Sequence, residues 1–366
     1  MNNNYLARFW QPATLFFIAL TITSCSKDRV IPKPVPGSPI TLGLYELGNG
    51  VNRRIFIPIS KVGTKSDTTY YGVFDTGSSG LTIDATGLLP KSMITSAGIT
   101  VTGDSVVVNG ITVTSKTAVV SFGDKTSLTK EYGNLAYAPI TIGDQNGNTT
   151  IKRIPIFLYY KVIDVNGKQL GSHSNDVFGV APGDSYAFSN ITSPLSYFAT
   201  GANLTSGFRL ATLNGQDFGT TGVYVSSLLT IGLTDADLAA SSGFIMHPLS
   251  IISPGGYSPD IPATITYNNK SIAAEVLFDT GTPSVTIIED KTAVNSIGNL
   301  PLNSVVTVTT NKGFTYRYTT TSTTNLTAIQ NPNNTNDLRT IFSIDFFIKN
   351  EILTDYTDHE IGLKNN

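Results

Sequence analysis

The sequence has very little of what metal sites, disulfide scaffolds and nucleic-acid-binding surfaces are built from. Its 366 residues include one cysteine and three histidines, which stand far apart at positions 173, 247 and 359. This spacing argues against the common zinc, iron–sulfur and disulfide patterns. Charged residues make up 14% of the chain, about half of the roughly 25% usual in soluble domains. The formal net charge is −2, with lysine and arginine scattered. We therefore expect no metal, no cofactor and no nucleic-acid partner.

Long hydrophobic runs are also missing, because no apolar run after residue 24 reaches the roughly 18 residues that a membrane-spanning helix needs. The chain begins with Arg8, a short apolar run over 15–20 and small residues before Cys25. That order is typical of a secretory signal. It resembles the signal of a bacterial lipoprotein, and the resemblance implies cleavage after residue 24 and acylation of Cys25.

The same resemblance implies a location. We predict a signal peptide over 1–24, a proline-rich tether over 25–40 and a lipid anchor (palmitate) at Cys25. The anchor would place the protein in the bacterial cell envelope, on the outer membrane, facing the periplasm or the outside. An ordinary secretory peptide with a chance cysteine is the alternative.

From about residue 41 onward, short apolar or alternating runs are separated by Gly, Asn, Asp and Pro. Regular spacing of this kind is typical of an all-β sandwich or barrel. One short segment over 193–199 has the signals of a helix, with Ser193 as the N-cap and Pro194 at the first helical position. Examples of such runs are 54–59, 105–108, 116–120, 155–160 and 305–309.

One motif occurs twice. Val73–Gly80 reads VFDTGSSG and Leu277–Ser284 reads LFDTGTPS, each between two apolar strands. The two aspartates, Asp75 and Asp279, are 279 − 75 = 204 residues apart, about the length of one domain. A repeat at this spacing predicts two related lobes, each presenting one copy of the motif.

The residue types of the motif suit metal-free hydrolysis of a peptide bond. Two carboxylates about 3 Å apart cannot both ionise, so a pair formed by Asp75 and Asp279 would share one proton and activate a water held between them. We expect the rest of the motif to build the two loops. Glycines allow tight turns, threonines can hydrogen-bond across the lobe junction, and the next hydroxyls can orient the carboxylates. These supporting residues are Thr76, Gly77, Ser78, Thr280, Gly281 and Thr282.

At these residues the chain resembles the pepsin-like, bilobal aspartic peptidases, and the similarity follows the chain order after residue 41. Phe122 stands near where the family has its flap hairpin, and Asp176–Ala181 resembles the strand that supports the first active-site loop. The resemblance implies two β-barrel-like lobes with a cleft between them, and aspartic endopeptidase activity on peptide or protein substrates. We predict lobes over 41–240 and 241–366, and a monomer.

The sequence departs from the family pattern at three positions. The family usually has a flap tyrosine bonded to a tryptophan, and here these positions are Phe122 and Thr82; the second-lobe supporting strand has Ser343 instead of glycine. A second hypothesis is therefore a catalytically inactive lipoprotein that binds peptides or other extended polymers in the cleft. A third is a surface β-sandwich adhesin with accidental motifs, which predicts that the two aspartates lie far apart.

Other polar residues have simpler interpretations. Asp176 and Asp345 stand beside apolar strands and are expected to be strand-entry or turn residues rather than catalytic acids. We expect His247, just before Pro248, to be a surface residue at a strand edge. The segment 344–350 resembles one of the family's closing strands.

Overall fold

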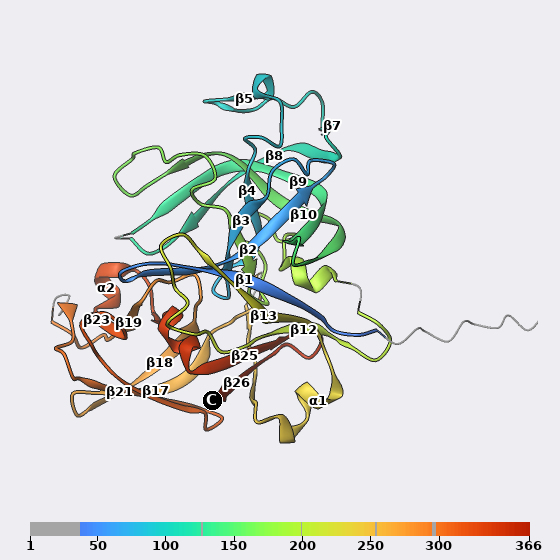
Figure 1. The fold of residues 1–366 in the computed structure, drawn as a ribbon. Coiled ribbons are helices and arrows are strands. Elements are labelled where there is room, and N and C mark those ends of the chain that lie inside the picture. The colour runs from blue at the N-terminus through green and yellow to red at the C-terminus, as the bar shows by residue number, and fades with distance from the viewer. Residues whose placement is uncertain (1–36, 126, 199, 253–254, 295–297) are drawn as a thin grey trace, which may run out of the picture. The chain divides into compact units, whose positions relative to one another are not determined.

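The computed structural model describes residues 37–125, 127–198, 200–252, 255–294 and 298–366. The predicted signal peptide, Cys25 and most of the tether lie outside these residues. The described chain is nearly all-β, with only short helical turns (Figure 1), so the predicted fold class is confirmed. No helix formed by the described residues is long and apolar enough to cross a membrane.

The strands fall into two large sheets and two small hairpins. In chain order the first half contains β1 (Ile40–Asn49), β2 (Asn52–Val62), β3 (Tyr70–Asp75), β4 (Ser79–Asp84), β5 (Ile94–Thr95), β6 (Gly98–Ile99), β7 (Ser105–Val108), β8 (Ile111–Phe122), β9 (Thr129–Asp144), β10 (Gly147–Ile163), β11 (Val177–Val180), β12 (Thr205–Leu210) and β13 (Val223–Leu233). The second half contains β14 (Ile245–Pro248), β15 (Ile251–Ile252), β16 (Gly256–Tyr257), β17 (Ile261–Tyr267), β18 (Lys270–Phe278), β19 (Val285–Glu289), β20 (Gly298–Asn299), β21 (Val305–Thr310), β22 (Thr315–Thr319), β23 (Leu326–Gln330), β24 (Arg339–Phe342), β25 (Asn350–Asp355) and β26 (Glu360–Asn365).

The helical turns are short and lie between strands. They are η1 (Lys91–Met93), η2 (Pro194–Tyr197), α1 (Asp235–Leu238), η3 (Ala240–Ser242), α2 (Pro332–Thr335) and η4 (Ile344–Ile348).

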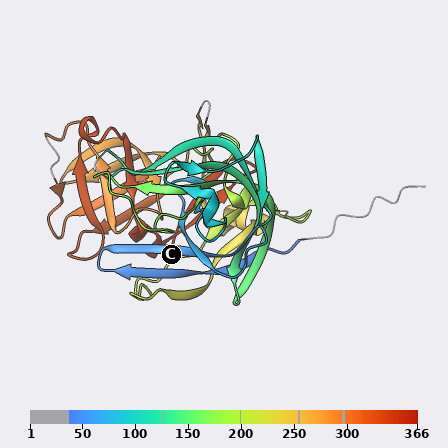
Figure 2. The same cartoon turned by 90° about the horizontal axis from the view of Figure 1, so that it is seen from above.

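The larger sheet has the order β14-β26-β25-β12-β13-β1-β2-β3-β11-β4-β10-β9-β8-β7, and β2 also pairs with β9. That extra pairing curls the first-lobe strands back on themselves (Figure 2). Strands β14, β25 and β26 come from the predicted second lobe, yet they continue this sheet beyond β12. The larger sheet is therefore built from both halves of the chain. The boundary between the lobes at 240/241 stays a prediction.

The second large sheet, β20-β23-β19-β24-β18-β17-β21-β22, repeats the arrangement around the first motif. In the first lobe, β11 runs parallel to β3 and antiparallel to β4. In the second lobe, β24 runs parallel to β18 and antiparallel to β19. Each motif thus lies in the turn between two strands that a third strand separates. The predicted supporting segment Asp176–Ala181 contains β11, which pairs with both strands of the first motif as expected.

Most local predictions agree with the structure. The five runs given as examples of strands all lie within strands, namely β2, β7, β8, β10 and β21. Ser193 caps η2 by accepting from Leu195 N, with Pro194 at its start, although the segment is a 3-10 helix. One prediction is wrong: residues 344–348 form η4, and the strand begins only at Asn350. The run Phe346-Phe347 is buried from a helical turn, so an apolar run alone does not identify a strand.

The phenylalanine before each aspartate points into the core of its own lobe. Phe74 and Phe278 are buried. Phe74 stacks on Phe178 at a centroid distance of 6.4 Å, and Phe278 packs on Phe342 at 5.4 Å. Because successive side chains on a strand point to opposite faces, burial of the phenylalanine turns the next residue, the aspartate, away from the core.

Gly179 lies where β11 supports the first motif, and we predict that a side chain there destabilises the protein. A Cβ at this position would lie 2.6 Å from the carbonyl oxygen of Ser78. Gly179→Ala is expected to lower the free energy of unfolding by about 1–3 kcal/mol, measured by denaturant titration. The matched control is Gly171→Ala, because a Cβ on Gly171 meets nothing within 4 Å. Equal stabilities of the two variants would contradict the prediction.

Candidate active site

The two predicted aspartates meet at the junction of the two lobes. Asp75 is the last residue of β3, and Asp279 directly follows β18. Their side chains are 8% and 9% exposed. A Cβ built on Gly281 would lie 2.6 Å from the Asp75 carboxyl carbon, and one on Gly77 would lie 2.6 Å from that of Asp279. Each motif glycine therefore lets its loop approach the carboxyl group of the other motif.

Two threonines tie the loops to each other in a reciprocal way. Thr76 Oγ1 donates to the carbonyl of Phe278 (2.7 Å) and accepts from Thr280 N (3.0 Å). Thr280 Oγ1 donates to the carbonyl of Phe74 (2.6 Å) and accepts from Thr76 N (3.1 Å). Both threonines are buried. The structure thus brings Thr76 and Thr280 together at the centre of the junction, where the bonds fix the separation of the loops.

Each carboxylate is oriented by bonds from its own loop, and the two loops use the same pattern. One oxygen accepts a backbone N–H of the motif glycine, and the other accepts the hydroxyl of the next residue. Such donors hold a carboxylate in one orientation. The bonds are Gly77 N to Asp75 Oδ1 (2.7 Å), Ser78 Oγ to Asp75 Oδ2 (2.6 Å), Gly281 N to Asp279 Oδ1 (2.7 Å) and Thr282 Oγ1 to Asp279 Oδ2 (2.6 Å).

The electrostatics of the pair favour one shared proton. Burial raises the pKa of Asp75 well above its ordinary value, and the adjacent Asp279 raises it further by charge repulsion and by a hydrogen bond between the two carboxyls. Bonds from Ser78 and Gly77 oppose this shift without reversing it. Two interacting carboxyls of this kind titrate as a unit.

Phe122, the predicted flap residue, ends β8 and pairs with Thr129 of β9. It lies before the tip of the hairpin, packed against the small apolar cluster of Val120, Leu135, Phe157, Tyr159, Val162 and Ile191. The ring therefore anchors one strand of the hairpin to the first lobe.

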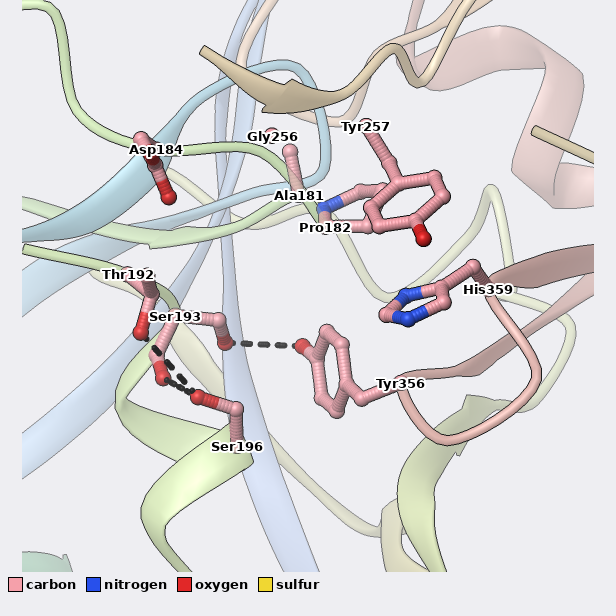
Figure 3. Close-up of a pocket in the computed structure, with 10 residues that line it drawn as sticks. All are labelled: Ala181, Pro182, Asp184, Thr192, Ser193, Ser196, Gly256, Tyr257, Tyr356 and His359. Atoms are coloured by element: carbon pink, nitrogen blue, oxygen red, sulfur yellow. Dashed lines mark hydrogen bonds between the residues drawn. The ribbon is translucent and has the colours of Figure 1, made fainter. Parts of the chain in front are cut away.

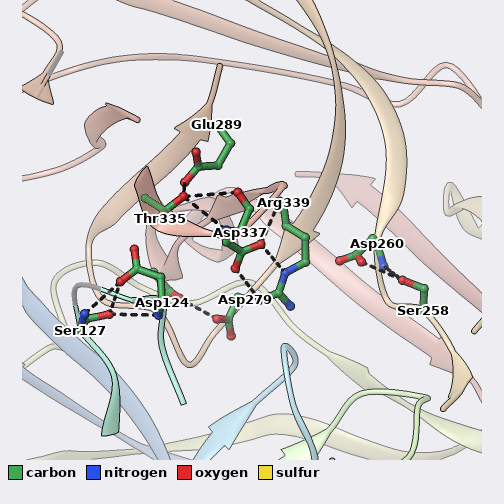
Figure 4. Close-up of polar contacts among 10 residues, drawn as sticks. Asp124, Ser127, Ser258, Asp260, Asp279, Glu289, Thr335, Asp337 and Arg339 are labelled. Atoms are coloured by element: carbon green, nitrogen blue, oxygen red, sulfur yellow. Dashed lines mark hydrogen bonds and ion pairs between the residues drawn. The ribbon is translucent and has the colours of Figure 1, made fainter. Parts of the chain in front are cut away.

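The tip of the β8–β9 hairpin reaches the second lobe. Lys125 N donates to the carbonyl of Thr335 in α2 (3.3 Å), and Thr335 Oγ1 donates to Glu289 (2.8 Å). Figure 4 shows Asp124 on the hairpin and Glu289 with Thr335 on the second lobe. Burial, and further the charges of Asp337 and Asp124, raise the pKa of Glu289. The hairpin tip therefore lies close enough to Glu289 for Asp124 to act on the charge of that carboxyl group.

Thr82, in the family's tryptophan position, belongs to a buried polar group that the sequence did not predict. Its hydroxyl donates to Glu131 Oε1 (3.3 Å), which also accepts from Asn175 Nδ2 (2.6 Å). Glu131 on β9 is fully buried, and its Oε2 has no partner among the described residues. Burial raises the pKa of Glu131 to about 8. The only indication of this buried group in the sequence is Glu131 itself, an acidic residue in the second strand of the β8–β9 hairpin.

The other polar predictions have mixed outcomes. Asp176 precedes β11 and accepts from Tyr159 Oη (2.7 Å), and Asp345 pairs with Arg53 (3.0 Å); both are structural, as expected. The prediction for His247 is wrong. This residue is 2% exposed, and its ring nitrogens bond the Ile361 carbonyl (3.1 Å) and Thr310 (2.7 Å). Pairing of β14 with β26 covers this strand.

The structure contains a cavity of about 260 Å³, whose lining residues are drawn in Figure 3. Ala181 N at its edge donates to the carbonyl of Ser78 (2.8 Å), so the cavity begins directly beside the first active-site loop. Its lining is rich in hydroxyl groups and includes a Tyr257–His359 stack with a centroid distance of 3.6 Å. The lining residues are Ala181, Pro182, Asp184, Thr192, Ser193, Ser196, Gly256, Tyr257, Tyr356 and His359.

Two solved structures resemble this chain over most of its length. The aspartic proteinase from Irpex lacteus aligns with a TM-score of 0.53 and 18% identity, over 90% of this chain and 98% of that one. Basic 7S globulin from soybean aligns with a TM-score of 0.56 and 12% identity, over 90% and 96%. No protein-family model and no curated protein sequence matches. At these identities the likeness shows the fold, which is pepsin-like.

Glu131 generates a prediction for pH-dependent stability. Because its pKa is about 8 in the folded protein, against about 4.5 for an ordinary glutamate, the folded state holds the proton more tightly than the unfolded state. Its stabilising effect is complete below pH 4.5 and is lost as the pH rises through about 8. Glu131→Gln is therefore expected to melt about 5 °C or more above wild type at pH 9 and near wild type at pH 4, by calorimetry.

The control for this experiment is Asp104→Asn, since Asp104 is an exposed acid of the first lobe. Its difference in melting temperature from wild type should be the same at both pH values. A Glu131→Gln variant that behaves like this control would show that Glu131 is ionised in the folded protein.

Proposed function

We propose that this protein is an aspartic endopeptidase that hydrolyses peptide bonds with a water activated between Asp75 and Asp279. The observation that carries the proposal is the reciprocal packing of the two motifs, in which each glycine lies against the other motif's carboxyl group. Two accidental motifs in a β-sandwich would have no reason to meet in this way. The pepsin-like fold and the likeness to an aspartic proteinase support the same reaction.

The geometry supplies each proton transfer. The ionised carboxyl takes a proton from the water as its oxygen attacks the peptide carbonyl carbon, and the protonated carboxyl donates to the carbonyl oxygen. The resulting tetrahedral diol collapses when the carboxyl that took the water's proton passes it to the peptide nitrogen, a diol hydroxyl gives its proton to the other carboxylate, and the C–N bond breaks. The raised pKa of Asp75 keeps one proton on the pair. The four bonds from the loops hold both carboxyls in place through the cycle.

The alternative is a protein of the same fold that binds peptides or other extended polymers without cleaving them. Basic 7S globulin shares the fold under a name that states no proteinase activity. Phe122 also lacks the hydroxyl of the family's flap tyrosine. Against this, the donors to both aspartates are complete, and a binding protein has no need of them.

Removing either acid tests the proposal. Asp75→Asn and Asp279→Asn are each expected to lower the turnover of a denatured protein substrate by roughly 10³-fold or more, because an amide can neither take nor share the proton. The assay covers acid to neutral pH, with pepstatin as a ligand for the dyad. Asp104→Asn, an exposed acid, is the control and should cleave like wild type. Pepstatin binding without cleavage by wild type would favour the alternative.

We further propose that the protein is a lipoprotein of the bacterial cell envelope, anchored through Cys25. The support is the order of Arg8, the apolar run over 15–20 and the small residues before Cys25. Proline-rich sequence follows, and proline-rich tethers are extended, which suits a catalytic unit held away from a membrane surface.

The anchor is tested by replacing the only cysteine. Cells expressing the wild-type chain with radiolabelled palmitate are expected to yield a labelled protein in the membrane fraction. Cys25→Ser is expected to lose both the label and the membrane association, since no other residue carries a thiol. A Ser24→Ala variant, with a small residue kept at the cut site, should remain labelled. Label that persists in Cys25→Ser would refute acylation at this position.

A further inference from the structure

Arg54 is a cation that the proposed mechanism does not use, and its strand turns it toward the catalytic pair. On β2 its neighbour Arg53 bonds Asp345 (3.0 Å) and lies 5.6 Å from the centre of the Phe218 ring. Successive side chains on a strand point to opposite faces, so Arg54 projects from the other face of β2. Leu47 pairs with Arg54 across the hairpin and is only partly buried.

The hairpin that carries Arg54 is fixed to the second motif loop. Ser284 N, two residues after Thr282, donates to the carbonyl of Val51 in the β1–β2 turn (3.1 Å). Arg54 is three residues beyond Val51 and therefore lies beside this loop. The guanidinium is within electrostatic reach of both aspartates: burial, the larger effect, lowers the pKa of Arg54, while the charges of Asp279 and Asp75 raise it.

The Arg54 guanidinium forms no ion pair with an acidic side chain of the described residues. Among the ion pairs formed by the described residues, none includes Arg54. Within the described part of the chain, the guanidinium makes one hydrogen bond, from Nη1 to the carbonyl of Arg53 (3.2 Å). A half-buried guanidinium has five donors in a fixed fork that suits a carboxylate. Most of these N–H donors have no acceptor among the described residues. They lie on the face of β2 that is turned toward Asp75 and Asp279.

We propose that Arg54 gives the protein a preference for peptides with an acidic side chain close to the scissile bond. The inference rests on the proposed function, since it places the peptide over Asp75 and Asp279. An extended peptide advances about 3.3 Å per residue, so a glutamate within two or three residues of the scissile bond can reach a cation beside the dyad. The partly buried apolar neighbours of Arg54, Leu47 and Phe56, would contact the methylene groups of that glutamate.

The test compares peptides that differ at one position. A cleavable peptide carries a single glutamate, moved in turn through the three positions on each side of the scissile bond, and each version is matched by glutamine. For at least one position, wild type is expected to cleave the glutamate peptide with roughly tenfold higher kcat/KM, as expected for one hydrogen-bonded ion pair. Arg54→Gln should bring the ratio to about one, Arg54→Lys should retain part of it, and Arg54→Glu should favour lysine at that position.

The ratio of the two peptides is the decisive quantity. Arg54 also acts on the charge of Asp75 and Asp279, but that effect is the same for both peptides at one pH and cancels in the ratio. Lys61→Gln removes an exposed positive charge from the same strand and should leave the ratio as in wild type. A wild-type ratio near one at every position, or an equal loss for both peptides in Arg54→Gln, would overturn the inference.

A binding measurement separates this inference from the proposed function. The Asp279→Asn variant is titrated with fluorescent versions of the same two peptides, followed by anisotropy. Tighter binding of the glutamate peptide that disappears in the Asp279→Asn, Arg54→Gln double variant supports the role of Arg54 even where wild type shows no cleavage. Cleavage by wild type with equal binding and equal rates for both peptides would uphold the proposed function and refute the role of Arg54.

Discussion

The site depends on the reciprocal hydrogen bonds between Thr76 and Thr280. Two carboxyl groups in contact repel each other when both are charged, and only a rigid junction keeps them in place. Each threonine donates to the carbonyl before the opposite aspartate and accepts from the opposite backbone. Individually such bonds contribute about 1 kcal/mol. Acting together in a buried site they fix two turns relative to each other, and the shared proton removes the remaining repulsion.

The two sheets deliver the motifs to this junction by the same construction. In each lobe an aromatic residue enters the core, the next residue is the aspartate, and a third strand runs between the two motif strands. The copies differ in detail. The first supporting strand has Gly179, because Ser78 O leaves no room for a Cβ. The second has a buried Ser343. The glycine of the first supporting strand is thus explained by the close approach of the Ser78 carbonyl.

The sequence predicted what is local or repeated. Alternation predicted the strands, and the repeated FDTG predicted two lobes with one aspartate each. What it did not predict comes from strands that meet only in three dimensions. Nothing near His247 in sequence indicates that β26 covers it. The role of Arg54 depends on which face of β2 points at the dyad, and that is set by the pairing of Arg53 with a residue 292 positions away. The partners of Glu131, Thr82 and Asn175, are 49 and 44 positions away in the sequence, so nothing local indicates this buried group.

The departures from the family pattern at Phe122 and Thr82 lie outside the hydrogen bonds that orient the two aspartates. Among the residues that the structure describes, the hydrogen bonds that orient Asp75 and Asp279 come from the two motif loops. Phe122 and Thr82 contribute none of them. Phe122 instead packs on the first-lobe cluster, and Thr82 bonds Glu131 on the second hairpin strand. The β8–β9 hairpin is therefore attached to the first lobe by apolar contacts and by a buried acid, instead of by a tyrosine–tryptophan hydrogen bond. Replacement of these two family residues leaves the geometry of Asp75 and Asp279 intact.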